Sequence, residues 1–231
     1  MTGEIREKLL DAAVAHVPFD GWSEATLAAA ALECGVDIEV ARGLFPDAGA
    51  SLAAAWHRRG DALLARRMQD ADLASLRYSQ KVAELVWQRL QLAGDKEVVR
   101  AASALFALPA NAAEGARLIW GTADCIWTLL GDKSRDYNWY TKRAILSGVY
   151  GASVLYWLGD SSEGDTRTRA FIDRRIADVM RFEKFKSGVR ANPLLARLAA
   201  LPEALLSGIR APTARRDDLP GHVRADGGDG R

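Results

Sequence analysis

The sequence lacks the features that mark several specialised classes of protein. It has only two cysteines in 231 residues, Cys34 and Cys125, which is too few for a disulfide scaffold or a four-thiolate metal site. No apolar run approaches the roughly 20 residues of a membrane-spanning helix, and no fixed repeat or sustained heptad is present. The net charge is only +1, so the whole composition indicates neither a nucleic-acid-binding protein nor one with a strongly acidic partner.

Helical spacing of apolar residues covers almost the whole chain, and no segment alternates as a convincing strand does. Gly, Pro, Asp or Asn stands at each break between the apolar segments, as helix ends require. We therefore expect an all-α fold, a bundle of about ten helices. The predicted helices cover residues 4–17, 23–35, 36–45, 51–69, 73–92, 96–108, 112–130, 139–158, 166–186 and 193–209.

The first sixty residues resemble the TetR-type regulators, in which three short helices precede a long helical region. The resemblance rests on Gly-Trp at 21–22, Thr-Leu at 26–27, the Gly-Val turn at 35–36 and Leu-Phe-Pro at 44–46. It implies that residues 1–47 form a subdomain like a helix-turn-helix.

The charge of this segment opposes DNA binding. Residues 1–60 carry five Lys and Arg against nine Asp and Glu, a net charge of −4, whereas affinity for DNA comes largely from basic side chains on phosphates. Asp37 and Glu39 stand at the start of the presumed recognition helix, where base-reading residues would enter the major groove. We therefore predict a retained scaffold that does not bind nucleic acid. The alternative is a ligand-sensing transcriptional regulator, which a basic helix would favour.

Trp and Tyr are concentrated in one part of the chain. Eight of the twelve lie between residues 120 and 157. Trp120 and Trp127 are seven residues apart and share a helix face with Asp124. One interpretation is a packed aromatic core; the other is the wall of a cavity for an apolar ligand between helices. Asp124 on such a face needs a partner such as Lys142 or Arg143, or else points outward, because an unpaired buried carboxylate is costly.

The segment from 131 to 150 suggests an interface. Asp136 or Asn138 can cap the following helix, which places Trp139 and Tyr140 in its first turn beside a polar loop. Exposed Trp and Tyr reduce solubility but are enriched at the energetic centres of interfaces.

Two segments, 123–150 and 159–179, closely resemble the coenzyme Q (ubiquinone) biosynthesis accessory family, lipid-binding proteins with a TetR-like fold. NWYTKR at 138–143 and the preceding GDxSxD at 131–136 are the most specific features, and residues 15–23 and 43–47 also fit. The resemblance covers about residues 4–210.

The resemblance implies a non-catalytic protein that binds an isoprenoid quinone or other lipid and assists the di-iron demethoxyubiquinone hydroxylase. It implies no cofactor, and we expect a homodimer. In that family the partner surface corresponds here to Asp124, Ile126, Trp139, Tyr140 and Arg143. Within a lipid-binding domain at 48–187, the expected lipid-contacting residues are Trp120, Trp127, Leu130, Tyr150 and Leu155.

No set of residues in the sequence indicates an enzyme. The histidines are His16, His57 and His222, without an HExxH or ExxH pair, so neither a zinc nor a di-iron site is predicted. His57 stands beside two arginines and is expected on a solvated stretch. Cys34 and Cys125 are expected as small core residues. A hydrolase or oxidoreductase would have needed a credible nucleophile–base pair.

The C-terminal part has a leucine stripe and an excess of positive charge. Residues 181–216 contain eight Lys and Arg against two Glu, a net charge of +6. An apolar face with flanking cations is typical of a helix lying on an anionic membrane; the alternative is a helix packed on its own domain or on a dimer mate. We expect an amphipathic helix at 188–210, a disordered tail at 211–231, and a cytoplasmic protein peripherally associated with the inner membrane. The predicted membrane-facing residues are Leu194, Leu195, Leu198, Leu201, Leu205 and Ile209.

Overall fold

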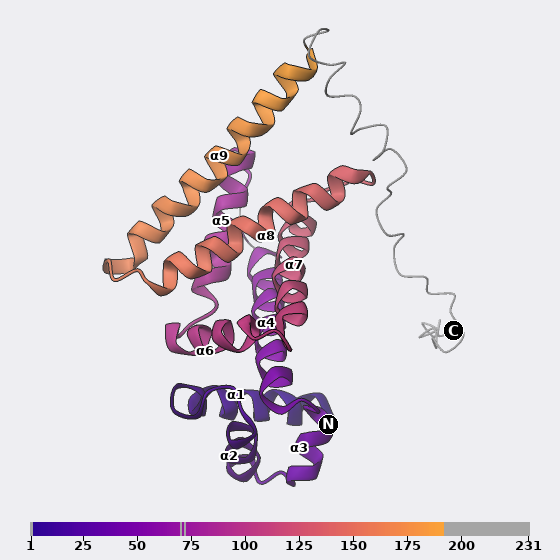
Figure 1. The fold of residues 1–231 in the computed structure, drawn as a ribbon, viewed down its shortest axis with the longest axis vertical. Helices are drawn as coiled ribbons and strands as arrows, with labels where there is room; N and C mark the ends of the chain where they lie inside the picture. The colour runs from indigo at the N-terminus through magenta and orange to yellow at the C-terminus, as the bar shows by residue number, and fades with distance from the viewer. Residues whose placement is uncertain (1, 70, 72, 192–231) are drawn as a thin grey trace, which may run out of the picture.

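A computed structural model describes residues 2–69, 71 and 73–191 (Figure 1). In this part of the chain the regular structure consists of nine α-helices and one short 3-10 helix, without a strand, which confirms the all-α prediction. The predicted helix at 193–209, its six membrane-facing residues and the tail lie outside the described residues. The elements are α1 (Thr2–Asp20), α2 (Glu24–Cys34), α3 (Ile38–Leu44), α4 (Ala48–Gln69), α5 (Tyr78–Gln91), α6 (Lys96–Ala107), α7 (Ala112–Leu129), α8 (Tyr137–Leu158), η1 (Glu163–Asp165) and α9 (Thr166–Ala191).

Helices α1, α2 and α3 gather at one end of the molecule, and α4 leads from them into the larger group of helices (Figure 1). The Ser23 side chain accepts a hydrogen bond from the Thr26 amide, which caps α2 as predicted. Gly35 ends α2 in the left-handed conformation, with φ of 62°, which glycine adopts without steric cost. The Trp22 indole donates to the Val98 carbonyl at 3.2 Å and so ties this end to α6.

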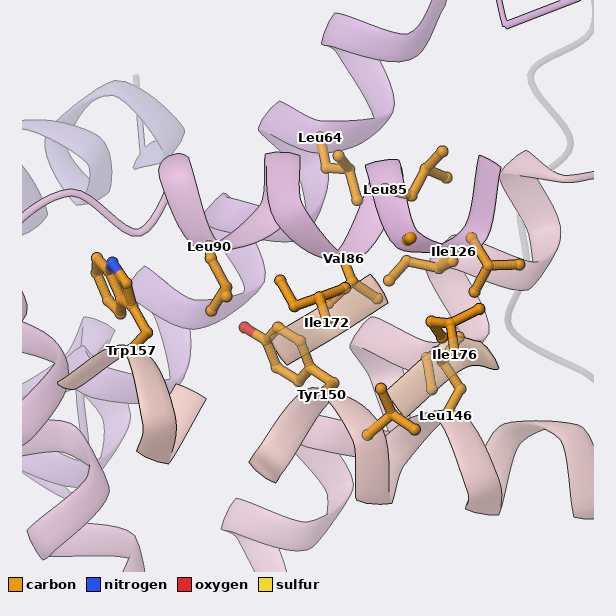
Figure 2. Packing of buried hydrophobic residues seen from close by; sticks show 14 of the residues in the cluster. Leu64, Leu85, Val86, Leu90, Ile126, Leu146, Tyr150, Trp157, Ile172 and Ile176 are labelled. Atoms are coloured by element: carbon orange, nitrogen blue, oxygen red, sulfur yellow. The ribbon is translucent and has the colours of Figure 1, made fainter. Parts of the chain in front are cut away.

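The larger group has its own apolar core, to which α4, α5, α7, α8 and α9 contribute (Figure 2). Helix α7 packs between α4 and α8, while α9 packs along α5 and α8. Leu85 and Val86 of α5 meet Ile172 and Ile176 of α9 in this cluster, together with Leu146 of α8. This arrangement places α4, α5, α6, α7 and α8 around the cavity described below.

Several helix boundaries differ from the predicted ones. Helix α5 begins at Tyr78 rather than at residue 73, because the Gln80 side chain accepts a hydrogen bond from the Arg77 amide and caps the helix there. The Asp136 side chain accepts from the Asn138 amide, so α8 begins at Tyr137. Helix α1 continues through Pro18 to Asp20, and α9 extends to Ala191.

The start of α4 crosses the backbone of the segment before α2 at Gly49. A Cβ atom at this position would lie 2.1 Å from the Trp22 carbonyl oxygen and 2.7 Å from the Ser23 nitrogen. Both atoms belong to the backbone, so neither can rotate away. Glycine is required here by close packing.

Replacing Gly49 with alanine is therefore expected to lower the free energy of unfolding by about 1–3 kcal/mol. Thermal and urea denaturation followed by circular dichroism measure the effect. Gly43→Ala is the matched control, since no atom lies within 4 Å of its added Cβ. Equal stability of the two variants would contradict the close crossing.

Candidate functional site

Helices α4 to α8 enclose a cavity of about 390 Å³. Its wall is mostly apolar and includes Trp56 of α4, Leu90 of α5, Phe106 of α6, Ile119 of α7 and Val154 of α8. The volume lies toward the small end of the range for ligand pockets, about 300–1,000 Å³. Such a wall suits an apolar ligand or the apolar part of a larger one.

The cavity has an exposed side and a buried side. Ala107, Ala112, Ala116 and Leu155 line it and are exposed to solvent, with Leu155 at 68%. They stand at the end of α6, at the start of α7 and on α8, and together they form the mouth. On the buried side lie two residues that are each only 2% exposed, Arg89 and Tyr150.

A hydrogen-bonded network holds the buried side together. Arg89 Nε donates to Asp61 Oδ1 at 2.7 Å, and its Nη2 donates to the His57 carbonyl at 2.8 Å. The Thr122 hydroxyl donates to the same Asp61 oxygen at 2.8 Å and lies 2.9 Å from His57 Nε2. A Cβ at Gly60 would lie 2.6 Å from Arg89 Cζ, so the guanidinium fits against α4 only because this residue is glycine.

The groups of this network differ in charge. Burial, reinforced by the nearby charge of Arg89, lowers the pKa of His57 to about 4, so the imidazole is neutral at pH 7. Burial also raises the pKa of the Tyr150 phenol, which stays protonated. Burial alone would lower the pKa of Arg89, but Tyr150 and Asp61 outweigh it and the pKa is raised. Arg89 with Asp61 therefore forms a charge-neutral pair beside two neutral side chains.

The cavity agrees with only part of the predicted lipid-contacting set. Tyr150 and Leu155 line it, whereas Trp120, Trp127 and Leu130 do not. The placement of His57 on a solvated stretch is wrong, because the ring turns inward from α4 to Thr122 on α7. Arg89 was missed as well. It follows Leu85 and Val86 by four and three residues, so it falls on the buried face of α5, and an arginine in such a stripe needs a partner.

A second charged network lies where α7 ends and α8 begins, and Arg143 is at its centre. The Arg143 side chain is 3% exposed, and its Nε lies 2.6 Å from Asp124 Oδ1. Its Nη1 lies 3.2 Å from Asp132 Oδ2 and donates to the Trp139 carbonyl at 3.1 Å. The guanidinium also stacks over the Trp139 ring, 3.9 Å from its centroid. Asp124 thus has the partner that an acid on an apolar face requires.

Asp132 completes this network. Lys142 Nζ lies 2.8 Å from Asp132 Oδ1, and the Ser134 hydroxyl donates to the same oxygen at 2.8 Å. Burial by itself raises the pKa of Asp132, but the hydrogen bonds from Lys142 and Ser134 and the charge of Lys142 outweigh it, so the pKa falls below its ordinary value. Asp132 and Arg143 side chains are each only 3% exposed.

Three of the five predicted partner-contacting residues meet at the surface above Arg143. Trp139 and Tyr140 are partly exposed, with ring centroids 4.8 Å apart, and both pack against Trp120 of α7. The Asp124 side chain is 45% exposed. We call Trp120, Asp124, Trp139 and Tyr140 the aromatic patch. Arg143 lies beneath it.

The fifth predicted residue, Ile126, is fully buried in the core, so no direct contact with a partner is available to it in this structure. Helix α7 turns its residue 126 inward while residues 120 and 124 face α8, which is a consequence of helical spacing. The Trp139 and Tyr140 rings, expected to be exposed, are partly exposed, because they pack on Trp120 and Trp139 covers the Arg143 guanidinium.

Other reactive groups do not assemble into a site. Within residues 2–69, 71 and 73–191, no three His, Cys, Asp or Glu side chains come together as a metal site requires. Burial raises the pKa of the Cys125 thiol to about 11, so it is protonated at neutral pH and is a poor nucleophile.

Among the described helices, none has the length and hydropathy needed to cross a bilayer. On α3, Arg42 pairs with Glu24 and Glu39, each at 2.7 Å.

Comparison with known proteins identifies the relatives of this chain. Residues 112–183, which contain α7, α8 and the aromatic patch, match the COQ9 family model. The chain is similar to the COQ9 proteins. It is 28% identical over 227 residues to the mitochondrial ubiquinone biosynthesis protein COQ9 of Bos taurus, covering 94% of this chain and 68% of that protein. COQ9 of Drosophila melanogaster is 30% identical over 188 residues, covering 79% and 57%.

The fold has its own match among solved structures. A TetR transcriptional regulator from Nitrosomonas europaea ATCC 19718 superposes with a TM-score of 0.61 over 75% of this chain and 97% of that one, at 19% identity. This likeness confirms the TetR-like fold and says nothing of function. The COQ9 matches confirm the family resemblance drawn from the sequence and support a role in ubiquinone biosynthesis.

The charged network beneath the aromatic patch leads to a test of stability. Asp132→Asn removes a buried charge next to Arg143, and breaking a buried pair from one side costs about 3–5 kcal/mol. Urea denaturation at pH 7 should show a loss of this order, whereas Asp20→Asn, the same change at an exposed acid, should have little effect.

The loss should also depend on pH. Because the pKa of folded Asp132 is lowered, its contribution is complete above the ordinary aspartate pKa of about 4 and disappears as the pH falls through the folded pKa. The difference between wild type and Asp132→Asn should therefore shrink in acid. A difference that stayed constant down to pH 3 would contradict the ion pairing.

Proposed function

We propose that this chain is a non-catalytic lipid-binding protein of ubiquinone biosynthesis, which binds an isoprenoid quinone or a related lipid and presents it to the demethoxyubiquinone hydroxylase. The observation that carries the proposal is the mostly apolar cavity enclosed by helices α4 to α8, which has a buried polar side. The similarity of the chain to the COQ9 proteins supports the same proposal. A polyprenyl quinone scarcely leaves a bilayer unaided, because moving its chain into water costs about 0.8 kcal/mol of transfer free energy for each CH₂ group. An apolar cavity offsets part of that cost.

The size of the cavity limits what it holds. At about 390 Å³ it takes a substituted ring and the beginning of a chain, so the rest of a long isoprenoid would extend through the mouth at Leu155. The C-terminal leucine stripe, outside the described residues, would keep the mouth near an anionic membrane surface. The chain supplies binding and shielding here, since Cys125 is protonated and His57 is engaged with Thr122.

The aromatic patch is the proposed contact for the di-iron hydroxylase. Trp139 and Tyr140 offer large, partly exposed rings beside the carboxylate of Asp124, a combination common at the energetic centres of interfaces. Arg143 fixes both Trp139 and Asp124 from below, so the patch is rigid before the partner arrives. Helices α7 and α8 form both this patch and part of the cavity wall, so lipid and partner would contact the same helix pair.

The helix-turn-helix is proposed to act as a scaffold. Arg42, the basic residue of α3, is paired with two glutamates, so it is not available for phosphates. With the acidic start of α3, this supports a protein that does not use its first three helices to read DNA.

Filling the cavity should weaken lipid binding. The nearest atom to a Cβ added at Gly151 is Ile119 Cδ1 at 3.8 Å, so Gly151→Phe would place a ring in the cavity. Binding of decylubiquinone, followed by quenching of tryptophan fluorescence, should weaken at least tenfold. Gly148→Phe is the matched control on α8, because Gly148 has no neighbour within 4 Å and lies outside the cavity. If Gly151→Phe bound the quinone normally, the cavity would not be the lipid site.

Truncation of the aromatic patch should weaken binding to the hydroxylase. Loss of an anchor residue typically costs 2 kcal/mol or more, about thirtyfold in affinity, and this is the effect expected for Trp139→Ala and Tyr140→Ala in a titration with the purified enzyme. The melting temperature should fall modestly for Trp139→Ala, which uncovers Arg143. Phe19→Ala, at an 88% exposed ring on α1, should leave the affinity unchanged. Wild-type affinity in both patch variants would move the interface elsewhere.

A further inference from the structure

The mouth of the cavity lies in a part of the surface formed by uncharged segments. Residues 101–113, from the end of α6 to the start of α7, contain no Asp, Glu, Lys or Arg, and neither do residues 144–158 of α8. Leu108, in the turn between α6 and α7, is 53% exposed, and Leu155 on α8 is 68% exposed. We call the exposed apolar residues around the mouth the rim: Ala107, Leu108, Pro109, Ala110, Ala112, Ala113, Ala116 and Leu155. An exposed apolar surface beside a cavity indicates contact with another apolar body.

The turn between α6 and α7 provides hydrogen-bond partners for its own backbone. The Leu108 amide and the Asn111 side chain both donate to the Leu105 carbonyl, each at 3.3 Å. The Asn111 amide donates to the Leu108 carbonyl at 2.9 Å, and Pro109 has no amide hydrogen that needs an acceptor. A backbone group without a partner is costly wherever water is scarce. These bonds therefore lower the cost of moving the turn out of water.

Positive charge borders the rim. Arg117 follows Ala116 on α7, and its side chain is 75% exposed. Arg58 of α4, which is 57% exposed, and Arg117 share Glu114 as their ion-pair partner, so these three side chains carry a net charge of +1. Exposed cations beside an apolar surface suit the anionic head groups of a membrane.

The composition of the rim differs from that of the aromatic patch. Five of the eight rim residues are alanine, which is depleted in the interfaces between proteins, whereas the patch has the Trp and Tyr that are enriched there. A fluid lipid layer adapts its shape to the surface that it meets, so it does not need large, well-fitted side chains. The rim therefore favours a lipid surface over a protein partner.

We propose that the rim docks on the surface of a membrane, so that the cavity opens directly into the lipid layer. This inference rests on the proposed lipid-binding function and adds the surface through which the ligand enters and leaves. A chain that extends through the mouth would then stay among lipids rather than in water. Ala112, Ala116 and Trp120 follow one another along α7 at steps of four, so the aromatic patch begins one turn from the mouth. A hydroxylase bound at the patch would lie beside the point where the lipid leaves.

Leu108→Asp tests this contact, because Leu108 belongs to the rim but does not line the cavity. Binding of the full-length variant to vesicles of phosphatidylcholine and phosphatidylglycerol, measured by co-sedimentation, should weaken about tenfold, since a carboxylate replaces an apolar side chain and meets anionic head groups. Leu32→Asp is the matched control, at an 85% exposed leucine of α2 outside the rim, and should leave vesicle binding unchanged. Both variants should bind decylubiquinone as wild type does.

A fluorescent label gives a readout that is independent of the affinity. The NBD group is attached to Leu108→Cys or to Leu32→Cys in a Cys34→Ala background. The Cys125 thiol, whose pKa is raised to about 11, reacts little at pH 7. On addition of vesicles, NBD emission at position 108 should rise and shift to shorter wavelength, and nitroxide-labelled lipids should quench it. The label at position 32 should show neither change.

The outcomes separate membrane docking from the proposed function. Equal vesicle binding by Leu108→Asp and wild type, or a label at position 108 that vesicles leave unchanged, would overturn docking through the rim while leaving the lipid-binding cavity. A Leu108→Asp variant that lost self-association or affinity for the hydroxylase, with normal vesicle binding, would overturn it in favour of a protein partner. Failure of wild type to bind decylubiquinone would overturn the proposed function, whereas quenching at position 108 would still support the membrane contact.

Discussion

The buried ion pair between Arg89 and Asp61 is the interaction on which the interior of the larger helical group depends. It joins α5 to α4, and the Thr122 hydroxyl on α7 donates to the same Asp61 oxygen. Arg89 also binds the His57 carbonyl, so α4 is held at two points one turn apart. Removing either charged partner would leave an uncompensated charge inside the protein. The close approach that makes this possible requires glycine at position 60.

The described part of the chain has two buried arginines that pair with aspartates, and they lie in different surroundings. Arg143, like Arg89, is almost completely buried and pairs with aspartates from another segment. Around Arg89, Asp61 and the His57 carbonyl accept hydrogen bonds from the guanidinium at the side of a mostly apolar cavity. Around Arg143, Asp124 and Asp132 accept hydrogen bonds and the Trp139 ring lies over the guanidinium. One arginine thus lies beside the cavity and the other lies beneath the aromatic patch.

The apolar core of the first three helices, rather than their surface charge, explains why this part of the chain has a TetR-like fold. A regulator of the TetR type has the same helix order, but the stability of such a subdomain comes from its apolar cluster and not from its surface charge. Leu9, Leu27, Phe45 and Leu52 fill that cluster here. Surface residues such as Asp37 and Glu39 can therefore be acidic without loss of the fold. Retention of the helix-turn-helix is thus compatible with a function away from DNA.

The sequence by itself determined the elements of this protein. Apolar periodicity and the capping residues Ser23, Gly35 and Asp136 were sufficient for the all-α class and for most helix positions, because these signals act over a few neighbouring residues. The motif at 131–143 was likewise sufficient for the family resemblance. The predicted start of α5 was wrong because the Gln80 side chain caps the helix at Arg77, and no Gly or Pro in the sequence marks this boundary.

Only the tertiary structure decided which residues share a site. His57 stands among arginines in the sequence and was expected in solvent, yet α7 packs on α4 and supplies Thr122, 65 residues away, as its partner. Ile126 and Asp124 are two residues apart, but the helix turns one into the core and the other to Arg143. The cavity draws its wall residues from five helices. Its existence follows from packing distances between segments that are far apart in the chain, which no local pattern of residues encodes.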